Sequence, residues 1–347
     1  MTPRPVRILH APANVGGHPI GLSRAERELG LDSEVVLFEP DAFGFPADRC
    51  YHRRDLPPWR TVPTRLRFLA EAARRYDVFH FNFGSTLLPG WGLPVAVDEL
   101  PLLRRLGKIV IATFQGDDAR PPEAWTPPPP PELWPGLERR RSAGRRRLLR
   151  YAHRVLYLNP DQRRWLTGAS FCPYASVDPR AIAPVPPRRE GELTIVHAPS
   201  HRATKGTDAV IAAVEQLRAD GARVRLDLVE GVRHDEALAR LAAADIAVDQ
   251  LLVGWYGGFA VEAMALGKPV LCHIVDEQPG DNPFGAELAI VRATPATLAQ
   301  RLAELVGDPD ARSAAGVAAR RFVERHHDPR RVASRVLEGL VTLPDPG

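Results

Sequence analysis

Two short segments in the C-terminal half combine cations, glycines and carboxylates in an order that suits an anionic ligand. The first, residues 199–208, carries Arg202 and Lys205 just before an expected helix start. Open amides and the positive dipole end of a helix start favour an anion, and two cations add to that attraction. This segment predicts a diphosphate site, with a capped helix and a solvated Arg-Lys pair as the alternative.

The second segment, residues 249–270, runs from a strand end through a glycine turn into a helix that carries one acid. Gly257 and Gly258 form the turn, and Glu262 lies one turn into the helix. Glycines allow close backbone approach and leave amides open to a ligand, and a carboxylate accepts hydrogen bonds from a ribose. We expect a second anion site here, with an ordinary first-turn acid as the alternative for Glu262.

The elements that must position these residues alternate between strand and helix along the chain. The expected strands lie at 6–10, 33–38, 77–83, 108–114, 155–158, 169–174, 193–198, 224–229, 246–251, 269–274 and 288–291. The helices expected between them lie at 20–29, 60–75, 97–106, 161–166, 207–218, 235–244 and 259–266, and three more follow between 296 and 340. This alternation predicts an α/β fold with parallel sheets, which bind ligands at the carboxyl ends of their strands.

Length and composition limit the class of protein. The 347 residues favour two domains, and 44% hydrophobic with 25% charged residues exclude a disordered, fibrous or disulfide-scaffold chain. The prolines gather in loops at 120–136, where an exposed polyproline segment is expected, and near 184–187, where a hinge is expected. The lack of an apolar run of about 18 residues or of a signal peptide predicts a cytoplasmic protein.

Several segments together resemble the large group of retaining glycosyltransferases that have the GT-B fold, use nucleotide sugars and carry a Glu-x7-Glu motif. They are residues 202–206 and 256–270, the Gly16-Gly17 loop and the closing segment 322–328, with weaker likeness at 77–84 and 114–120. The resemblance implies two Rossmann-like domains that face a central cleft. Residues 1–187 would bind the acceptor, 188–325 the donor, and a C-terminal helix at 326–347 would cross back to the first domain.

The resemblance also implies an activity and roles for single residues. A hexose would pass, with retention, from a nucleoside diphosphate sugar to an unknown acceptor, without a metal or another cofactor. Arg202 and Lys205 would hold the diphosphate and Glu262 the ribose. The residues expected to bind the donor are Gly16, Gly17, Glu230, Gly257, Gly258, Phe259 and Glu262, and those expected in catalysis are Arg202, Lys205, Gln115 and Asp249.

Two positions depart from the pattern of that group. The first glutamate of the motif falls on Gly254, so Asp249 or Gln250 is the expected substitute. Gln115 stands where many relatives have a histidine that contacts the donor sugar. These departures keep a second hypothesis open: a catalytically silent GT-B module that binds a nucleotide sugar or a partner from a glycan pathway. A sugar-nucleotide epimerase is a third, with no acid/base residues evident for it.

Charge is distributed unevenly along the chain. Residues 1–187 hold 27 Lys and Arg against 19 Asp and Glu, whereas residues 188–347 hold 19 against 23. Eight arginines fall between Arg139 and Arg154. This run favours an anionic or lipid-linked acceptor and peripheral contact with the inner membrane face, or else a solvated helix. The absence of interleaved aromatic residues counts against nucleic acid.

Among the histidines, His18 is the expected substrate contact.

Overall fold

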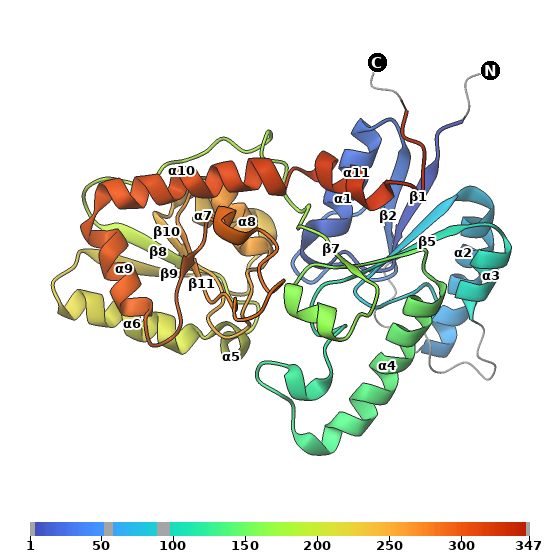
Figure 1. Cartoon of the computed structure of the whole chain (residues 1–347), viewed down its shortest axis with the longest axis horizontal. Helices are drawn as coiled ribbons and strands as arrows, with labels where there is room; N and C mark the ends of the chain where they lie inside the picture. The colour runs from blue at the N-terminus through green and yellow to red at the C-terminus, as the bar shows by residue number, and fades with distance from the viewer. Residues whose placement is uncertain (1–3, 52–57, 89–97, 345–347) are drawn as a thin grey trace. The chain divides into compact units, whose positions relative to one another are not determined.

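The computed structural model describes residues 4–51, 58–88 and 98–344 (Figure 1). The chain divides into two compact units, which we call unit 1 (residues 1–176 and 329–347) and unit 2 (residues 177–328). The sequence places the corresponding boundaries at 187/188 and 325/326. Unit 1 therefore takes up the last segment of the chain after unit 2 has been completed.

Unit 1 is built on a parallel sheet of seven strands in the order β3-β2-β1-β4-β5-β6-β7. The strands are β1 (Arg7–Ala11), β2 (Asp32–Leu37), β3 (Arg49–Cys50), β4 (Val78–Asn82), β5 (Ile109–Phe114), β6 (Arg154–Tyr157) and β7 (Ser170–Phe171). From β1 the chain first adds strands on one side and then, from β4 on, on the other. The carboxyl ends of β1 and β4 thus form the topological switch point, where open α/β sheets bind ligands.

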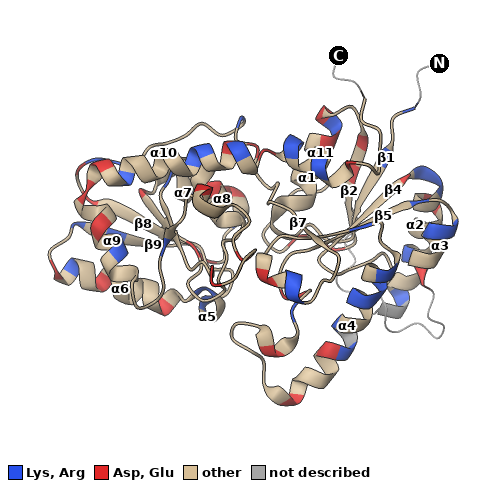
Figure 2. Cartoon of the chain, in the orientation of Figure 1, with Lys and Arg blue, Asp and Glu red and all other residues tan. Residues whose placement is uncertain are grey.

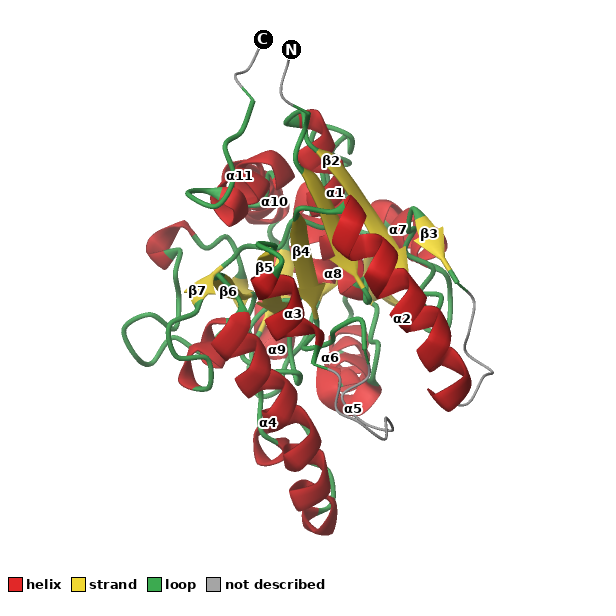
Figure 3. Ribbon diagram, turned by 90° about the vertical axis from the view of Figure 1, so that its right-hand side faces the viewer, coloured by secondary structure: helices red, strands yellow, loops and turns green. Residues whose placement is uncertain are grey.

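In the described part of unit 1, five α-helices accompany this sheet; Figure 3 draws helices in red. They are α1 (His18–Glu28), α2 (Pro58–Arg75), α3 (Glu99–Arg105), α4 (Trp134–Tyr151) and α11 (Pro329–Leu337). Leu9 and Phe79 pack on one face of the sheet against apolar residues of α2, α3 and α4. Because side chains alternate along a strand, His10 and His80 point to the other face. The amphipathic α11 packs against α1 and buries Val336 and Leu337.

Unit 2 is built on a parallel sheet of five strands in the order β12-β11-β10-β8-β9. The strands are β8 (Leu193–His197), β9 (Val224–Leu228), β10 (Ile246–Val248), β11 (Val270–Cys272) and β12 (Val291–Arg292). Its helices are α5 (Arg202–Lys205), α6 (Thr207–Ala219), α7 (His234–Ala243), α8 (Gly258–Ala265), α9 (Leu298–Gly307) and α10 (Pro309–His326). Here the switch point lies between β8 and β10, which both precede segments with candidate site residues.

The predicted alternation of strands and helices is confirmed, and with it the α/β class with parallel sheets. One expectation fails in part at the proline loop. The segment forms 3-10 turns at Pro122–Ala124 and Pro131–Leu133, and α4 begins at Trp134 inside the expected loop. Prolines stand in the first turns of these helices, where a missing N–H costs nothing and the fixed φ suits the helix.

Candidate functional site

The candidate site of unit 2 begins where the chain leaves β8. Residues 202–205 form the single turn α5 instead of the expected loop, and the chain then bends at Gly206 before α6 starts. Gly206 has a φ of 75°, and a Cβ there would lie 3.1 Å from the Cβ of Leu251. A glycine therefore allows the break between the two helices and brings Lys205 close to the loop after β10.

Lys205 contacts the first two residues after β10. Its Nζ donates a hydrogen bond to Oε1 of Gln250 at 2.5 Å and lies 3.5 Å from Oδ1 of Asp249. The Lys205 side chain is 15% exposed and that of Asp249 only 2%. An ammonium group carries three N–H donors, and the described residues engage two of them. One N–H remains for a ligand in a partly desolvated position.

Asp249 links Lys205 to the glycine turn. Its Oδ2 accepts a hydrogen bond from the Gly257 amide at 2.6 Å. A Cβ at Gly257 would lie 3.6 Å from both Asp249 Oδ2 and Lys205 Nζ, so the ammonium, the carboxylate and the glycine backbone lie side by side. The expectation of an open amide at Gly257 is therefore wrong, because Asp249 already accepts from it. An anion bound here would compete with Asp249 for the Lys205 ammonium group and the Gly257 amide.

The helix α8 starts directly after this amide. Gly258 and Phe259 are its first two residues, and no side chain caps them. The first amides of a helix have no acceptor within that helix, and the dipole favours negative charge beside them. The half-buried Gly258 and Phe259 thus extend the donor groups of Lys205 along one side of the site.

Glu262 lies in the second turn of α8 and is held by a histidine. Its Oε1 lies 2.6 Å from Nε2 of His234, the first residue of α7. The Glu262 side chain is only 11% exposed. This contact occupies one of the two carboxylate oxygens, and the other can accept from a hydroxyl group.

Arg202 and Glu230 are brought together as a pair. Nε and Nη2 of Arg202 donate to the two carboxylate oxygens of Glu230 at 2.8 and 2.5 Å. This two-pronged bond raises the pKa of Arg202 and lowers the pKa of Glu230. The arginine side chain is 54% exposed, so Glu230 neutralises a cation at the edge of the site. Lys205 is the better shielded of the two predicted cations.

No protein-family model and no curated protein matches the chain. Among the solved structures that are similar over nearly its whole length are the following three. Sucrose-phosphate synthase from Thermosynechococcus elongatus matches with a TM-score of 0.62 at 16% identity, over 96% of this chain and 97% of its own. HepE from Anabaena, in complex with UDP-glucose, matches with 0.62 at 14%, over 97% and 99%. WaaG, a glycosyltransferase involved in lipopolysaccharide biosynthesis, matches with 0.59 at 14%, over 96% and 100%.

The chain has the GT-B fold. The fold expected from the sequence is thereby confirmed. One unit contains a seven-stranded parallel sheet and the other a five-stranded parallel sheet. In unit 2, Arg202 and Lys205 follow β8, and Asp249 and Gly257 follow β10, its neighbour in the sheet.

Gly254 occupies the position where a glutamate was expected from the resemblance. Its φ is 85°, which side chains rarely adopt, and a Cβ there would lie 2.7 Å from Cγ2 of Val275. A side chain at 254 would therefore be strained and would have to displace Val275. Asp249, the substitute expected from the sequence, bonds to the backbone of Gly257, three residues after 254.

The remaining predicted residues belong to unit 1. Gln115 follows β5, and its side-chain Nε2 is buried without a hydrogen-bond partner among the described residues. Gly16 and Gly17 have φ values of 62° and 69° in the turn before α1. At Gly17 a Cβ would lie 2.9 Å from the ring of Phe45, whereas nothing lies within 4 Å at Gly16. Both glycines thus allow the turn, and Gly17 also allows the Phe45 ring to pack closely against the backbone.

His18 is buried and faces the protein. Its Nδ1 accepts a hydrogen bond from the Ala175 amide at 3.0 Å, and its exposure is 0%. The expected substrate contact at His18 is therefore wrong. The side chain ties α1 to the strand-end segment at 175 instead.

A cavity of about 850 Å³ lies in unit 1. Loops after β1, β2 and β4 line it together with α4, whose contribution includes Arg139, Arg141 and Arg147. Figure 2 shows the basic residues along α4 in blue. Arg147 is bound to Asp98 and Glu99, and Arg141 donates to the Asp117 carbonyl and covers the ring of Trp125. Part of the arginine run therefore holds unit 1 together, while Arg139, Arg146 and Arg150 are exposed.

Two histidines of unit 2 were not singled out in the sequence. His234 holds Glu262, and His197 contacts the Val248 carbonyl at 2.8 Å and the Thr207 hydroxyl at 3.0 Å. Burial lowers the pKa of His197, so a neutral ring joins the ends of β8 and β10 to α6. The signal for His197 was its position as the last residue of a strand; nothing local pointed to His234.

Among the described helices, none is both long and apolar enough to cross a membrane.

Proposed function

We propose that the chain is a glycosyltransferase that moves a sugar from a nucleoside diphosphate donor to an acceptor, and that unit 2 binds the donor. The observation that carries this proposal is the gathering of Lys205, Asp249 and Gly257 at the switch point of the five-stranded sheet. The amides that start α8 lie beside them. That HepE has the same fold and was solved with UDP-glucose supports a UDP-sugar as the first donor to test.

The transfer breaks the bond between the anomeric carbon and the diphosphate, and a bond to an acceptor hydroxyl oxygen replaces it, while the proton of that hydroxyl passes to the leaving diphosphate. Positive charge develops on the sugar while negative charge grows on the leaving diphosphate. Lys205, with its remaining N–H, and the amides of Gly258 and Phe259 stabilise that growing anion. Asp249 holds Lys205 and the Gly257 backbone in position, and Glu262, oriented by His234, accepts from the ribose hydroxyls. Retention at the anomeric carbon follows the resemblance.

The acceptor site proposed for this reaction is the cavity of unit 1. It opens among the loops at the carboxyl ends of β1, β2 and β4 and includes the exposed Arg139. Arginine binds carboxylates and phosphates through several N–H donors at once. We therefore propose an acceptor that carries an anionic group. A lipid-linked phosphate that is reached at a membrane surface is one such molecule.

A second function is favoured by Gly254 and Asp249. A glutamate at 254 would be strained and would displace Val275, and the substitute Asp249 already accepts from Gly257. A protein that binds a nucleotide sugar without turning it over fits these two facts.

Both functions are tested by one panel. The pure protein is incubated with UDP-, GDP- and dTDP-sugars, with and without anionic acceptors, and both binding and release of nucleoside diphosphate are measured. Release of nucleoside diphosphate supports the transferase. Binding with no release under any condition supports the silent module, and no binding of any donor contradicts both.

A further inference from the structure

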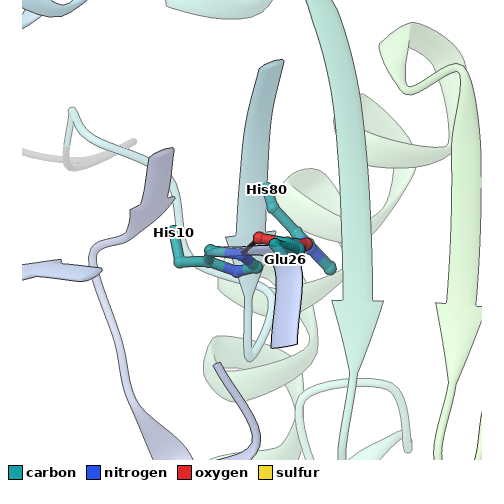
Figure 4. Close-up of side chains that lie close together, drawn as sticks. All are labelled: His10, Glu26 and His80. Atoms are coloured by element: carbon teal, nitrogen blue, oxygen red, sulfur yellow. Dashed lines mark hydrogen bonds and ion pairs between the residues drawn. The ribbon is translucent and has the colours of Figure 1, made fainter. Parts of the chain in front are cut away.

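Three side chains of the kinds that bind metal ions gather inside unit 1. His10 comes from β1, Glu26 from α1 and His80 from β4 (Figure 4). One nitrogen or oxygen atom from each lies within 4.8 Å of those of the other two. Their exposures are 0, 0 and 1%, so the group is sealed from solvent. Within the described ranges, no other set of three His, Cys, Asp or Glu side chains is this close.

The fold brings these residues together from distant points of the sequence. β1 and β4 are parallel neighbours whose register pairs His10 with His80, so both rings point to the same face of the sheet. Their ring centroids are 4.8 Å apart. Glu26 reaches this pair from α1, near the end of that helix. The opposite face of the same strands, with Leu9 and Phe79, is purely apolar core.

Each of the three side chains has one polar atom that is held by a neighbour. Nε2 of His10 lies 2.8 Å from Oε2 of Glu26. The Ser33 hydroxyl donates to that same Oε2 at 2.6 Å. Nε2 of His80 lies 2.7 Å from the Thr113 hydroxyl. Metal-binding imidazoles and carboxylates are oriented in this way by hydrogen bonds from a surrounding shell.

Each of these three side chains also has one polar atom without a hydrogen-bond partner among the described residues. Nδ1 of His10, Oε1 of Glu26 and Nδ1 of His80 are buried, and the described residues provide no hydrogen-bond partner for them. Buried polar atoms without partners oppose folding, and they are rare in native proteins. Three of them on neighbouring side chains indicate that the group has a ligand of its own.

We propose that His10, Glu26 and His80 bind one divalent transition-metal ion of the Zn²⁺ class. Two imidazoles and one carboxylate are ligands that Zn²⁺ takes, at about 2.0–2.2 Å each, so small side-chain rotations bring donors of this group around one ion. The seal against solvent keeps the ion away from substrates. Its role is structural: it joins β1, β4 and α1 at the switch point of the sheet. The expectation that transfer needs no metal concerns the transfer reaction, in which this structural ion takes no part.

The test is the metal content of the full chain. Protein from cells grown with added Zn²⁺ is dialysed against EDTA, and metal per chain is measured by plasma mass spectrometry. We expect one Zn²⁺ per wild-type chain and at least a tenfold lower content in Glu26→Gln and His80→Gln, since lost ligands weaken such sites by about that much or more. His327→Gln is the matched control, because His327 is equally buried but lies in unit 2 and contacts Tyr256.

A second measurement guards against variants that fail to fold. Glu26→Gln keeps the shape of the side chain and can still bond to Ser33 and His10, so its circular dichroism spectrum is expected to match the wild type. Wild-type protein refolded with Co²⁺ is expected to show the visible absorption of bound Co²⁺, and folded Glu26→Gln to lack it. Wild type that stays metal-free after both treatments, or variants that hold as much metal as His327→Gln, would overturn the proposal.

Discussion

Gly254 has a backbone conformation that restricts which residue can stand there. Alanine at 254 must adopt a φ near 85° and must also push Val275 aside, since its Cβ would lie 2.7 Å from that side chain. We expect Gly254→Ala to lower the free energy of unfolding by about 2 kcal/mol or more. Gly221→Ala is the matched control, because Gly221 has a φ of 87° with nothing within 4 Å of its Cβ.

Urea denaturation of both variants measures the difference. The control loses stability only through the backbone conformation, so Gly254→Ala should be the less stable of the two. Equal losses would show that Val275 gives way freely. In that case the exclusion of a glutamate at 254 would rest on backbone conformation alone.

Asp118 is predicted to make unit 1 sensitive to pH. Burial raises its pKa from 3.8 to about 6, although its carboxylate accepts hydrogen bonds from the amides of Gln115 and Gly116. A raised carboxyl pKa favours the protonated folded state, so this stabilisation is complete below the unfolded pKa and is lost as pH rises through about 6. The stability of the wild type relative to Asp118→Asn should therefore fall by about 3 kcal/mol between about pH 3 and pH 7.

Chemical denaturation of both proteins across that pH range provides the measurement. Other titrating groups are common to both proteins and cancel in the difference. A difference that stays flat with pH, or that grows as pH rises, contradicts the assignment of a raised pKa to Asp118.

At the scale of elements, the break between α5 and α6 sets the position of Lys205. Gly206→Ala forces a residue with a Cβ into a φ of 75° and against Leu251, at 3.1 Å. We expect α5 to shift and the Kd of a UDP-sugar to rise about tenfold, equivalent to about 1.4 kcal/mol. Calorimetric titration compares Gly206→Ala with Gly221→Ala, and equal affinities of the two would show that the break does not position the site.

Elements with strong local signals were predictable from the sequence. The apolar runs of β1, β8 and β10 and the three helices after residue 296 lie where expected, because burial of a strand or a helix face leaves a clear pattern. Two of the short elements were not predicted. The two-residue strand β3 and the single turn α5 depend on pairing with β2 and on contacts with Leu251, which lie outside any local window.

The structure brings together three residues of unit 2 that were expected from the sequence, but the sequence did not show how they pair. Lys205 and Gly257 were expected from residue type and position, and Asp249, with Gln250 as the alternative, as the substitute for the glutamate missing at 254. Only the folded chain shows three pairings: Asp249 accepts from Gly257, Glu230 neutralises Arg202, and His234 holds Glu262. These partners are 8, 28 and 28 residues apart in the sequence. The cluster of His10, Glu26 and His80 escaped notice because only the strand register shows that His10 and His80 are neighbours.

At the scale of the whole molecule, the basic excess lies in residues 1–187, most of which belong to unit 1. The basic excess of the N-terminal half includes the arginines of α4, and several of these bind acids or carbonyl groups within unit 1. The cations proposed to act on the donor are fewer, and Lys205 is the one that is shielded from solvent. The proposed transfer therefore depends on a single ammonium group in unit 2.

The rate of nucleoside diphosphate release by Lys205→Ala tests this central claim most directly, with the donor identified by the panel. Loss of one group that stabilises the leaving anion should lower kcat by about 10²–10³-fold, with a much smaller change in the Kd of the donor. Lys108→Ala, in unit 1, is the control and should keep the wild-type rate. A kcat of Lys205→Ala equal to that of the wild type would contradict the account.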